Sequence, residues 1–252
     1  MGTTIARQPE DLLLYPDDDG EPMSDNTIQF RWIQTIVAGL QVLFRDRADV
    51  FVAGNLLWYA REGASDERVA PDAMVVFGRP KGERGSYMQW REGGVAPQVV
   101  FEVRSPGNDD EEMRRKFRFY DDRGVEEYYL FDPHAKRFQG WVRRDGRLVE
   151  VEEVRGWVSP SLGIRFETRG PEGLTIHHPD GSPFGTPVEE WEEKLKERRG
   201  KLEERRRKVA ERKRAEAAET RAEAERERAE AERERAERFK ARLRELGESV
   251  DD

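Results

Sequence analysis

A glutamate stands inside one of the most apolar stretches of the sequence. Residues 97–108 read PQVVFEVRSPGN, which predicts a buried strand over residues 98–104 with Glu102 near its end. Burying an unpaired carboxylate is costly, so Glu102 needs a cation, a hydrogen-bond donor or a proton beside it. The simplest alternative is an edge strand on which Glu102 faces water.

A second acidic residue begins another apolar stretch. Residues 70–77 read APDAMVVF, which predicts a strand entered through Pro71 with Asp72 at its first position. If this strand pairs with the one that carries Glu102, both carboxylates reach the same end of the sheet, where neighbouring strands lie about 4.8 Å apart. Two ionised acids repel at that distance unless a divalent cation lies between them. Oxygen ligands of this kind favour Mg²⁺, with Mn²⁺ as an alternative.

Basic residues follow the two acids. Arg104 is on the same side of its strand as Glu102, because strand side chains alternate between faces. The next predicted helix contains RRKFRFY, which includes Lys116. Two acids and a lysine are the side chains that metal-assisted phosphodiester hydrolysis requires, since the metal lowers the pKa of a bound water and the lysine orients that water or takes its proton.

Four short motifs occur in a fixed order, namely PD at 71–72, EVRS at 102–105, KFRFY at 116–120 and GVEEYYLFDP at 124–133. The series resembles the Uma-type restriction endonuclease family of the PD-(D/E)XK nuclease superfamily, from residue 15 to about residue 185. The resemblance implies a restriction-endonuclease-like mixed β-sheet flanked by helices. It also implies that Asp72 and Glu102 are catalytic residues that bind the metal ion.

The chain departs from the superfamily pattern at one position. The superfamily lysine belongs two residues after the glutamate, where this chain has Arg104. Arginine stays protonated and cannot act as a base, although it can hold a phosphate. We therefore assign the catalytic lysine to Lys116, displaced onto the following helix. The alternative is that Lys116 is a solvated charge. Glu21, before the first helix, could supply a further acid, but its residue type fits a turn better.

The elements around these residues predict an α+β domain. Ser24, Asp25 and Asn26 form an N-cap cluster before a stretch of helical period, TIQFRWIQTIVAGLQVLF. Residues 49–60 predict a strand pair or a bulged strand, and Asp145-Gly146 predicts a hairpin. The helix that carries Lys116 is predicted to begin at an Asn108 cap and to end at Gly124.

The composition divides the chain into parts. We predict a flexible arm over residues 1–20, a nuclease-like domain over 21–188, a charged helix or weak coiled coil over 189–247 and a disordered tail over 248–252. Residues 189–252 carry 21 basic and 21 acidic residues, so the whole net charge of −8 falls on the preceding part. Alanines at seven-residue intervals offer little apolar area, so a lone charged helix and a coiled coil stay open as alternatives.

The sequence therefore favours a cytoplasmic Mg²⁺-dependent endonuclease that hydrolyses DNA, with no membrane partner. The helix over 189–247 is expected to serve assembly, either with a second copy or with another protein. The rival interpretation is a catalytically inactive nuclease-fold module whose helix is the working part, which the negative charge of the domain favours. Arg79, Lys81 and Arg84 are the residues of a Gly-rich loop that could contact a nucleic-acid backbone.

Overall fold

The computed structural model describes residue 15 and residues 26–245, without the side chains of residues 190 and 243–245. The chain divides into two compact units, Met1–Glu190 and Trp191–Asp252. Predictions for the arm over 1–20, for Glu21, Ser24 and Asp25, and for the tail over 248–252 lie outside the described residues. The predicted domain boundaries stay predictions.

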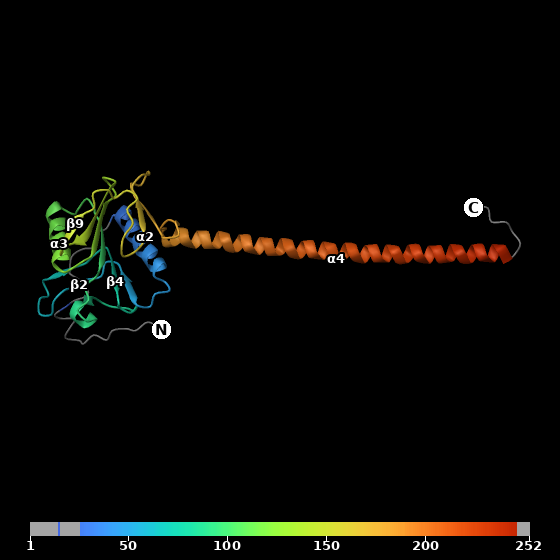
Figure 1. Ribbon diagram of the computed structural model, residues 1–252, viewed down its shortest axis with the longest axis horizontal. Helices are drawn as coiled ribbons and strands as arrows, with labels where there is room; N and C mark the ends of the chain where they lie inside the picture. Colours follow the sequence, from blue (N-terminus) through green and yellow to red (C-terminus); the bar gives the residue numbers. More distant parts are fainter. Residues whose placement is uncertain (1–14, 16–25, 246–252) are drawn as a thin grey trace. The chain divides into compact units, whose positions relative to one another are not determined.

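A six-stranded mixed sheet organises the first unit (Figure 1). Its spatial order is β1-β4-β6-β7-β8-β9, and only β6 and β7 run parallel among these neighbours. The bounds are Val50–Ala53 for β1, Ala73–Phe77 for β4, Val99–Val103 for β6, Glu127–Asp132 for β7, Arg137–Arg144 for β8 and Arg147–Glu150 for β9. This confirms the predicted α+β fold with a mixed sheet.

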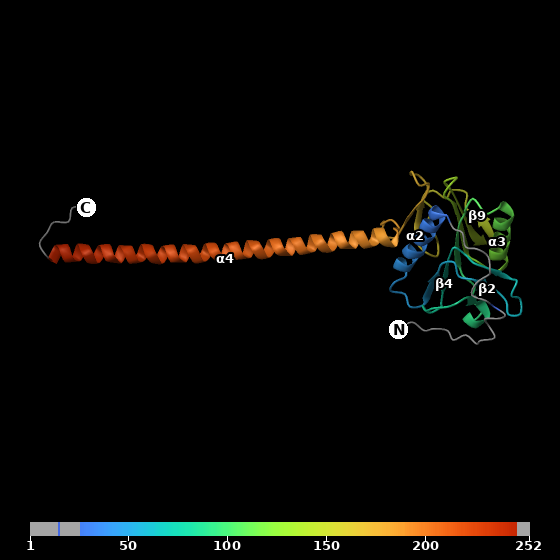
Figure 2. The same cartoon turned by 180° about the vertical axis from the view of Figure 1, so that it is seen from behind.

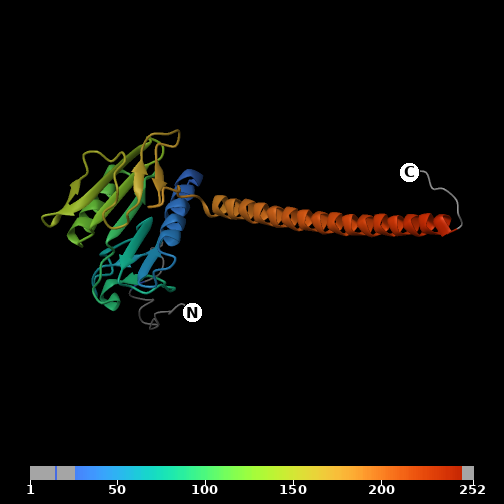
Figure 3. The same cartoon turned by 45° about the vertical axis from the view of Figure 1, so that its right-hand side comes forward.

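Two helices cover the opposite faces of this sheet (Figure 3). Helix α2 (Thr27–Leu43) packs its apolar side on the face that carries Val75, Val99 and Phe101. Helix α3 (Asp110–Asp122) packs on the face that carries Met74, Val76 and Val100. The alternation of strand side chains thus builds two separate cores from the same strands.

Two smaller sheets and a short helix complete the unit, and the view from behind shows β2 below α3 (Figure 2). One sheet has the order β3-β2-β5 and the other pairs β10 with β11. The bounds are Trp58–Tyr59 for β2, Arg68–Val69 for β3, Tyr87–Met88 for β5, Gln89–Glu92 for the 3-10 helix η1, Arg165–Glu167 for β10 and Thr175–His177 for β11. The predicted pairing within residues 49–60 is therefore wrong, because β1 and β2 belong to different sheets.

The ends of the elements follow their local chemistry. The Asn26 side chain accepts hydrogen bonds from the backbone N–H groups of Ile28 and Gln29, as an N-cap does. Helix α3 is capped by Asp109 and not by the predicted Asn108, whose side chain instead accepts a bond from the Ser105 backbone N–H. The predicted Asp145-Gly146 turn is confirmed, since both residues have positive φ between β8 and β9.

The described part of the second unit is one helix. Helix α4 runs without a break over Pro187–Glu245 (Figure 1). From residue 191 to residue 242 its side chains are exposed, apart from the half-buried Leu195. Ion pairs four residues apart, such as Glu197 with Lys201 and Glu204 with Lys208, support a charged helix. The predicted long helix is confirmed, while its pairing into a coiled coil stays a prediction.

Candidate active site

The register of two neighbouring strands places Asp72 opposite Glu102. Strands β4 and β6 are antiparallel, with Ala73 paired to Phe101 and Met74 paired to Val100. One further step along the same register brings Asp72 level with Glu102, and residues directly opposite each other have Cβ atoms about 4.5–5.5 Å apart. The predicted pairing of these two strands is confirmed. Both acids lie on the sheet face that α3 covers.

Asp72 is held by the neighbouring strand. Asp72 is 9% exposed, and its Oδ2 atom accepts a hydrogen bond of 2.6 Å from the backbone N–H of Val103. This bond connects the two strands at the end of their paired region. It orients the Asp72 carboxylate toward the end of β6 that carries Glu102.

Glu102 is buried in the interior of the sheet with two partners from one helix. The residue is 2% exposed. Its Oε2 atom accepts a hydrogen bond of 2.8 Å from Lys116 Nζ, and its Oε1 atom accepts one from the Tyr120 hydroxyl. Lys116 and Tyr120 are four residues apart on α3 and so face the same side of that helix. The alternative of an edge strand with Glu102 in water is wrong.

The electrostatics of the site keep Lys116 charged. Burial alone lowers the pKa of its ammonium, but the charges of Glu102 and Asp72 outweigh burial, and the pKa is raised overall. Burial and the charge of Glu102 also raise the pKa of Tyr120 well above its usual value. The phenol is therefore neutral and acts as a hydrogen-bond donor to Glu102. The solvated-charge alternative for Lys116 does not hold, because its side chain is mostly buried in an ion pair with Glu102.

A buried hydroxyl on β7 completes the surroundings of the acids. Tyr128 is buried, and burial together with the charges of Glu102 and Asp72 raises the pKa of its phenol well above the usual value. Within the described part of the chain its hydroxyl has no hydrogen-bond partner. Sequence reasoning did not select Tyr120 or Tyr128. Tyr120 could have been selected from the sequence, because it lies one helical turn after Lys116.

Arg104 lies elsewhere, at the start of the loop before α3. Its guanidinium donates hydrogen bonds to the Asn108 carbonyl at 3.3 Å and to Asp110 Oδ1 at 2.5 Å. The side chain therefore stabilises the loop before α3, the helix that carries Lys116. The structure brings Asp72, Glu102 and Lys116 together and directs Arg104 to a different partner.

The acids offer a donor set that fits Mg²⁺. No group of three or more metal-binding acidic or histidine side chains occurs within residue 15 and residues 26–245. Magnesium commonly uses one or two carboxylates and completes its shell with water and substrate phosphate oxygens. A carboxylate has about four lone-pair sites, and the described bonds to Glu102 use two of them. Glu102 therefore retains acceptor capacity for a hard cation, and Asp72 lies opposite it in the register.

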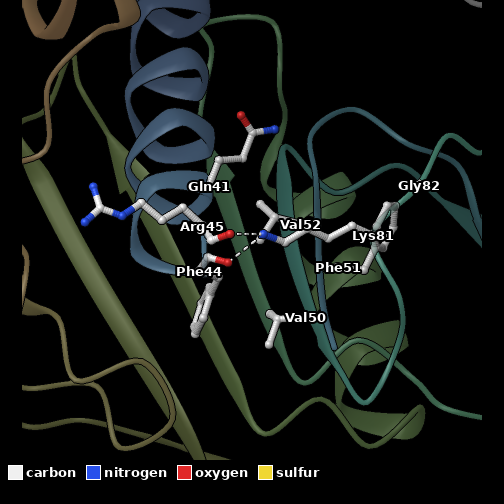
Figure 4. Close-up of a pocket in the computed structure, with 8 residues that line it drawn as sticks. All are labelled: Gln41, Phe44, Arg45, Val50, Phe51, Val52, Lys81 and Gly82. Carbon is white, nitrogen blue, oxygen red and sulfur yellow. Dashed lines mark hydrogen bonds between the residues drawn. The ribbon is translucent and has the colours of Figure 1, made fainter. Parts of the chain in front are cut away.

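A separate surface pocket of about 410 Å³ lies at the C-terminal end of α2 (Figure 4). Lys81 crosses it and donates hydrogen bonds to the carbonyls of Phe44 and Arg45 (Figure 4). Arg84 is buried in an ion pair with Glu92. Lys81 and Arg84 thus have partners within the fold, and contact of the Gly-rich loop with a nucleic-acid backbone stays a prediction.

One comparison with known proteins, the one with family models, identifies a family. A model of the Uma2 family, described as "Putative restriction endonuclease", matches residues 14–170. One solved structure that matches is titled a putative nuclease belonging to DUF820 from Anabaena variabilis ATCC 29413. It has 15% identity and a TM-score of 0.42, and the match covers 58% of this chain and 81% of that one. No curated protein matches the sequence.

None of the described helices is sufficiently long and apolar to cross a membrane.

Proposed function

The chain belongs to the Uma2 family, described as "Putative restriction endonuclease", and from this premise we propose that it is a Mg²⁺-dependent endonuclease that hydrolyses phosphodiester bonds in DNA. The observation that carries the proposal is the 2.8 Å contact between Lys116 Nζ and Glu102 Oε2, with Asp72 opposite Glu102 in the register. An acid pair with a charged lysine is the arrangement that this chemistry uses.

Asp72 and Glu102 are the residues that would hold the metal ion. A bound Mg²⁺ would supply a water of lowered pKa and would offset negative charge on the phosphate. The protein contributes two carboxylates that are fixed before any ligand arrives, Asp72 by the Val103 backbone and Glu102 by Lys116 and Tyr120. Preorganised ligands of this kind avoid the cost of ordering at the moment of binding.

Lys116 acts in this proposal as a donor to the oxygens of the site. Burial lowers the pKa of its ammonium, but the charges of Glu102 and Asp72 raise it by more, so the side chain is a cation in the metal-free protein. An ammonium has three N–H donors, and the described bond to Glu102 uses one of them. The others suit a water molecule or a phosphate oxygen. The Tyr128 hydroxyl is a further donor for an oxygen that enters the site.

The test is single-turnover cleavage of a supercoiled plasmid in Mg²⁺, with DNA binding measured separately in Ca²⁺. Lys116→Met should lower the cleavage rate constant at least ~100-fold while DNA affinity stays within about twofold, because the ammonium acts mainly in the transition state. Arg104→Met is the matched control and should cleave at close to the wild-type rate.

Two results would contradict the proposal. Cleavage by Lys116→Met at the wild-type rate would remove the assigned role of this lysine. A wild-type chain that binds DNA but does not cut it with either Mg²⁺ or Mn²⁺ would favour the rival function, a binding module with a nuclease fold. The net charge of −8, all of it before residue 189, is the observation that favours this rival.

The metal ion has a test that does not depend on cleavage. A cation that binds only the folded state raises the free energy of unfolding, by about 2.7 kcal/mol at a hundred times its dissociation constant. Mn²⁺ should therefore raise the melting temperature of the wild type by several degrees, and Asp72→Asn or Glu102→Gln should abolish the increase. Equal stabilisation of all three proteins would rule out a metal at this acid pair.

A further inference from the structure

The charge of α4 is distributed unevenly along the helix. Residues 194–214 contain 12 Lys and Arg residues against 4 Glu residues. Residues 215–245 contain 9 Lys and Arg residues against 10 Glu residues. The overall balance of the C-terminal part therefore conceals a first segment that is strongly basic and a second that is close to neutral.

Helical geometry collects half of these basic residues on one side. Six of the basic residues follow one another at alternating intervals of four and three positions, which places them in a single row along the helix. At about 1.5 Å per residue the row is about 27 Å long. All of its members are exposed. We call it the basic row, and it consists of Lys194, Arg198, Lys201, Arg205, Lys208 and Arg212.

The glutamates of the helix offset only part of the charge of the basic row. Lys201 pairs with Glu197 at 2.5 Å, Lys208 pairs with Glu204 at 2.6 Å and Arg212 pairs with Glu216 at 2.8 Å. These pairs are exposed to solvent, which screens them. Four glutamates in the segment leave it with a net charge of +8, and like charges three and four residues apart repel one another along the row. A partner with dense negative charge would relieve that repulsion.

A second copy of the helix is a poor partner for this face. Leu195, Leu202 and Val209 form an apolar row beside the basic row, at intervals of seven residues. Basic residues flank it on both sides, with Arg198 and Arg205 on one side and Arg199 and Arg206 on the other. Two helices paired along the apolar row would bring these like charges together, which opposes pairing.

We propose that residues 194–214 of α4 form a docking surface for the phosphate backbone of duplex nucleic acid. The inference rests on the proposed function, because a nuclease must hold a polyanion, and the part of the chain before residue 189 carries a net charge of −8. A duplex presents one phosphate charge for about every 1.7 Å of its axis, so a 27 Å row faces more phosphates than it has cations. The contacts are electrostatic and carry no sequence preference.

The experiment compares three full-length proteins in binding to a fluorescent 30-base-pair duplex, in EDTA so that no cleavage occurs. The first is the wild type, and the second replaces all six residues of the basic row by glutamine. The third, the matched control, replaces six arginines of the neutral segment by glutamine and so changes the net charge equally. These are Arg221, Arg226, Arg228, Arg233, Arg235 and Arg238.

Six phosphate contacts predict a slope of about −5 for the logarithm of the wild-type binding constant against the logarithm of the KCl concentration. The basic-row variant should lose most of this slope and bind at least ~100-fold more weakly at low salt, while the control keeps most of the wild-type affinity. Circular dichroism checks that both variants retain α4, since glutamine is a good helix former. If the basic-row variant lost the helix, a wild-type slope shallower than about −2 would still overturn the proposal.

Other outcomes separate this inference from its alternatives. Equal weakening of both variants would assign binding to overall charge, and no weakening of either would exclude α4; each overturns the proposal. Unchanged duplex binding with a loss of sedimentation on phosphatidylserine vesicles would identify a membrane surface instead. Binding that depends on the basic row in a chain that never cleaves DNA would contradict the proposed hydrolysis alone. Cleavage with binding independent of the row would contradict this inference alone.

Discussion

Two glutamates are buried in the same sheet, each 2% exposed, and their surroundings differ completely. Glu102 lies on β6 on the face covered by α3, beside Asp72, and its partners are the ammonium of Lys116 and the hydroxyl of Tyr120. Glu127 begins β7 on the opposite face, in line with Val99 of β6. Hydrogen-bond donors surround both carboxylates, so burial alone does not distinguish a candidate active-site residue from a structural residue of the core.

The partners of Glu127 are all neutral. Its Oε2 atom accepts hydrogen bonds from the hydroxyls of Tyr129, at 2.6 Å, and Ser159, and its Oε1 atom accepts one of 2.6 Å from the Ser161 backbone N–H. These bonds tie the segment before β10 to the main sheet. Glu102 instead accepts a hydrogen bond from a charged donor, the Lys116 ammonium, and lies beside a second acid, Asp72. Neutral partners alone indicate a role for Glu127 in stabilising the fold, whereas the charged partner and the second acid set Glu102 apart.

The largest expected effect on stability belongs to Glu127. Glu127→Ala removes three hydrogen bonds to a charged acceptor, each worth about 1.5–3 kcal/mol, and leaves buried donors without a partner. We expect a loss of roughly 5 kcal/mol in the free energy of unfolding, measured by urea titration. The exposed neighbour Glu126 provides the control, since Glu126→Ala should cost less than about 0.5 kcal/mol. Equal losses would show that the Glu127 cluster does not hold the two segments together.

A smaller effect is expected from the ion pair of the candidate site. Glu102→Gln and Lys116→Met should each cost about 2–3 kcal/mol, because each leaves a buried charge without its partner. The double variant should cost about 2 kcal/mol less than the sum of the single ones, since it removes both charges. Strictly additive losses would mean that the two groups do not interact in solution, and the comparison with Glu127 would lose its basis.

The sequence was sufficient to predict the parts of this comparison that depend on local pattern. The apolar runs around Asp72 and Glu102 predicted two strands, and pairing of these strands was the condition that would bring both acids to one end of the sheet. The signals at Asn108 and Gly124 predicted the helix that carries Lys116, although the N-cap is Asp109. Family resemblance added the mixed sheet, which periodicity alone could not give.

The rest depends on contacts between residues far apart in the sequence. Glu127 meets Ser159 and Ser161 more than thirty positions later, and nothing in the local pattern indicates that approach. The Tyr128 hydroxyl acquires its position only when β7 joins β6. Asp109 and Asn108 are equally good caps by residue type, and the bond from the Ser105 backbone to Asn108 decides between them.

The smallest effect is expected at Arg104, and it tests which basic residue belongs to the site. The Arg104 side chain is 31% exposed and its partner Asp110 is 69% exposed, so solvent screens the pair. Arg104→Met should therefore cost less than about 1 kcal/mol in the free energy of unfolding, well below the cost of Lys116→Met under the same urea titration. Arg104 precedes the loop before α3 and Lys116 lies on α3, and of these two residues only Lys116 pairs with a buried acid. If Arg104→Met cost as much as Lys116→Met, or if the two changes were coupled by more than about 1 kcal/mol, Arg104 would be part of the charge balance around Glu102. Lys116 would then share its proposed role with Arg104.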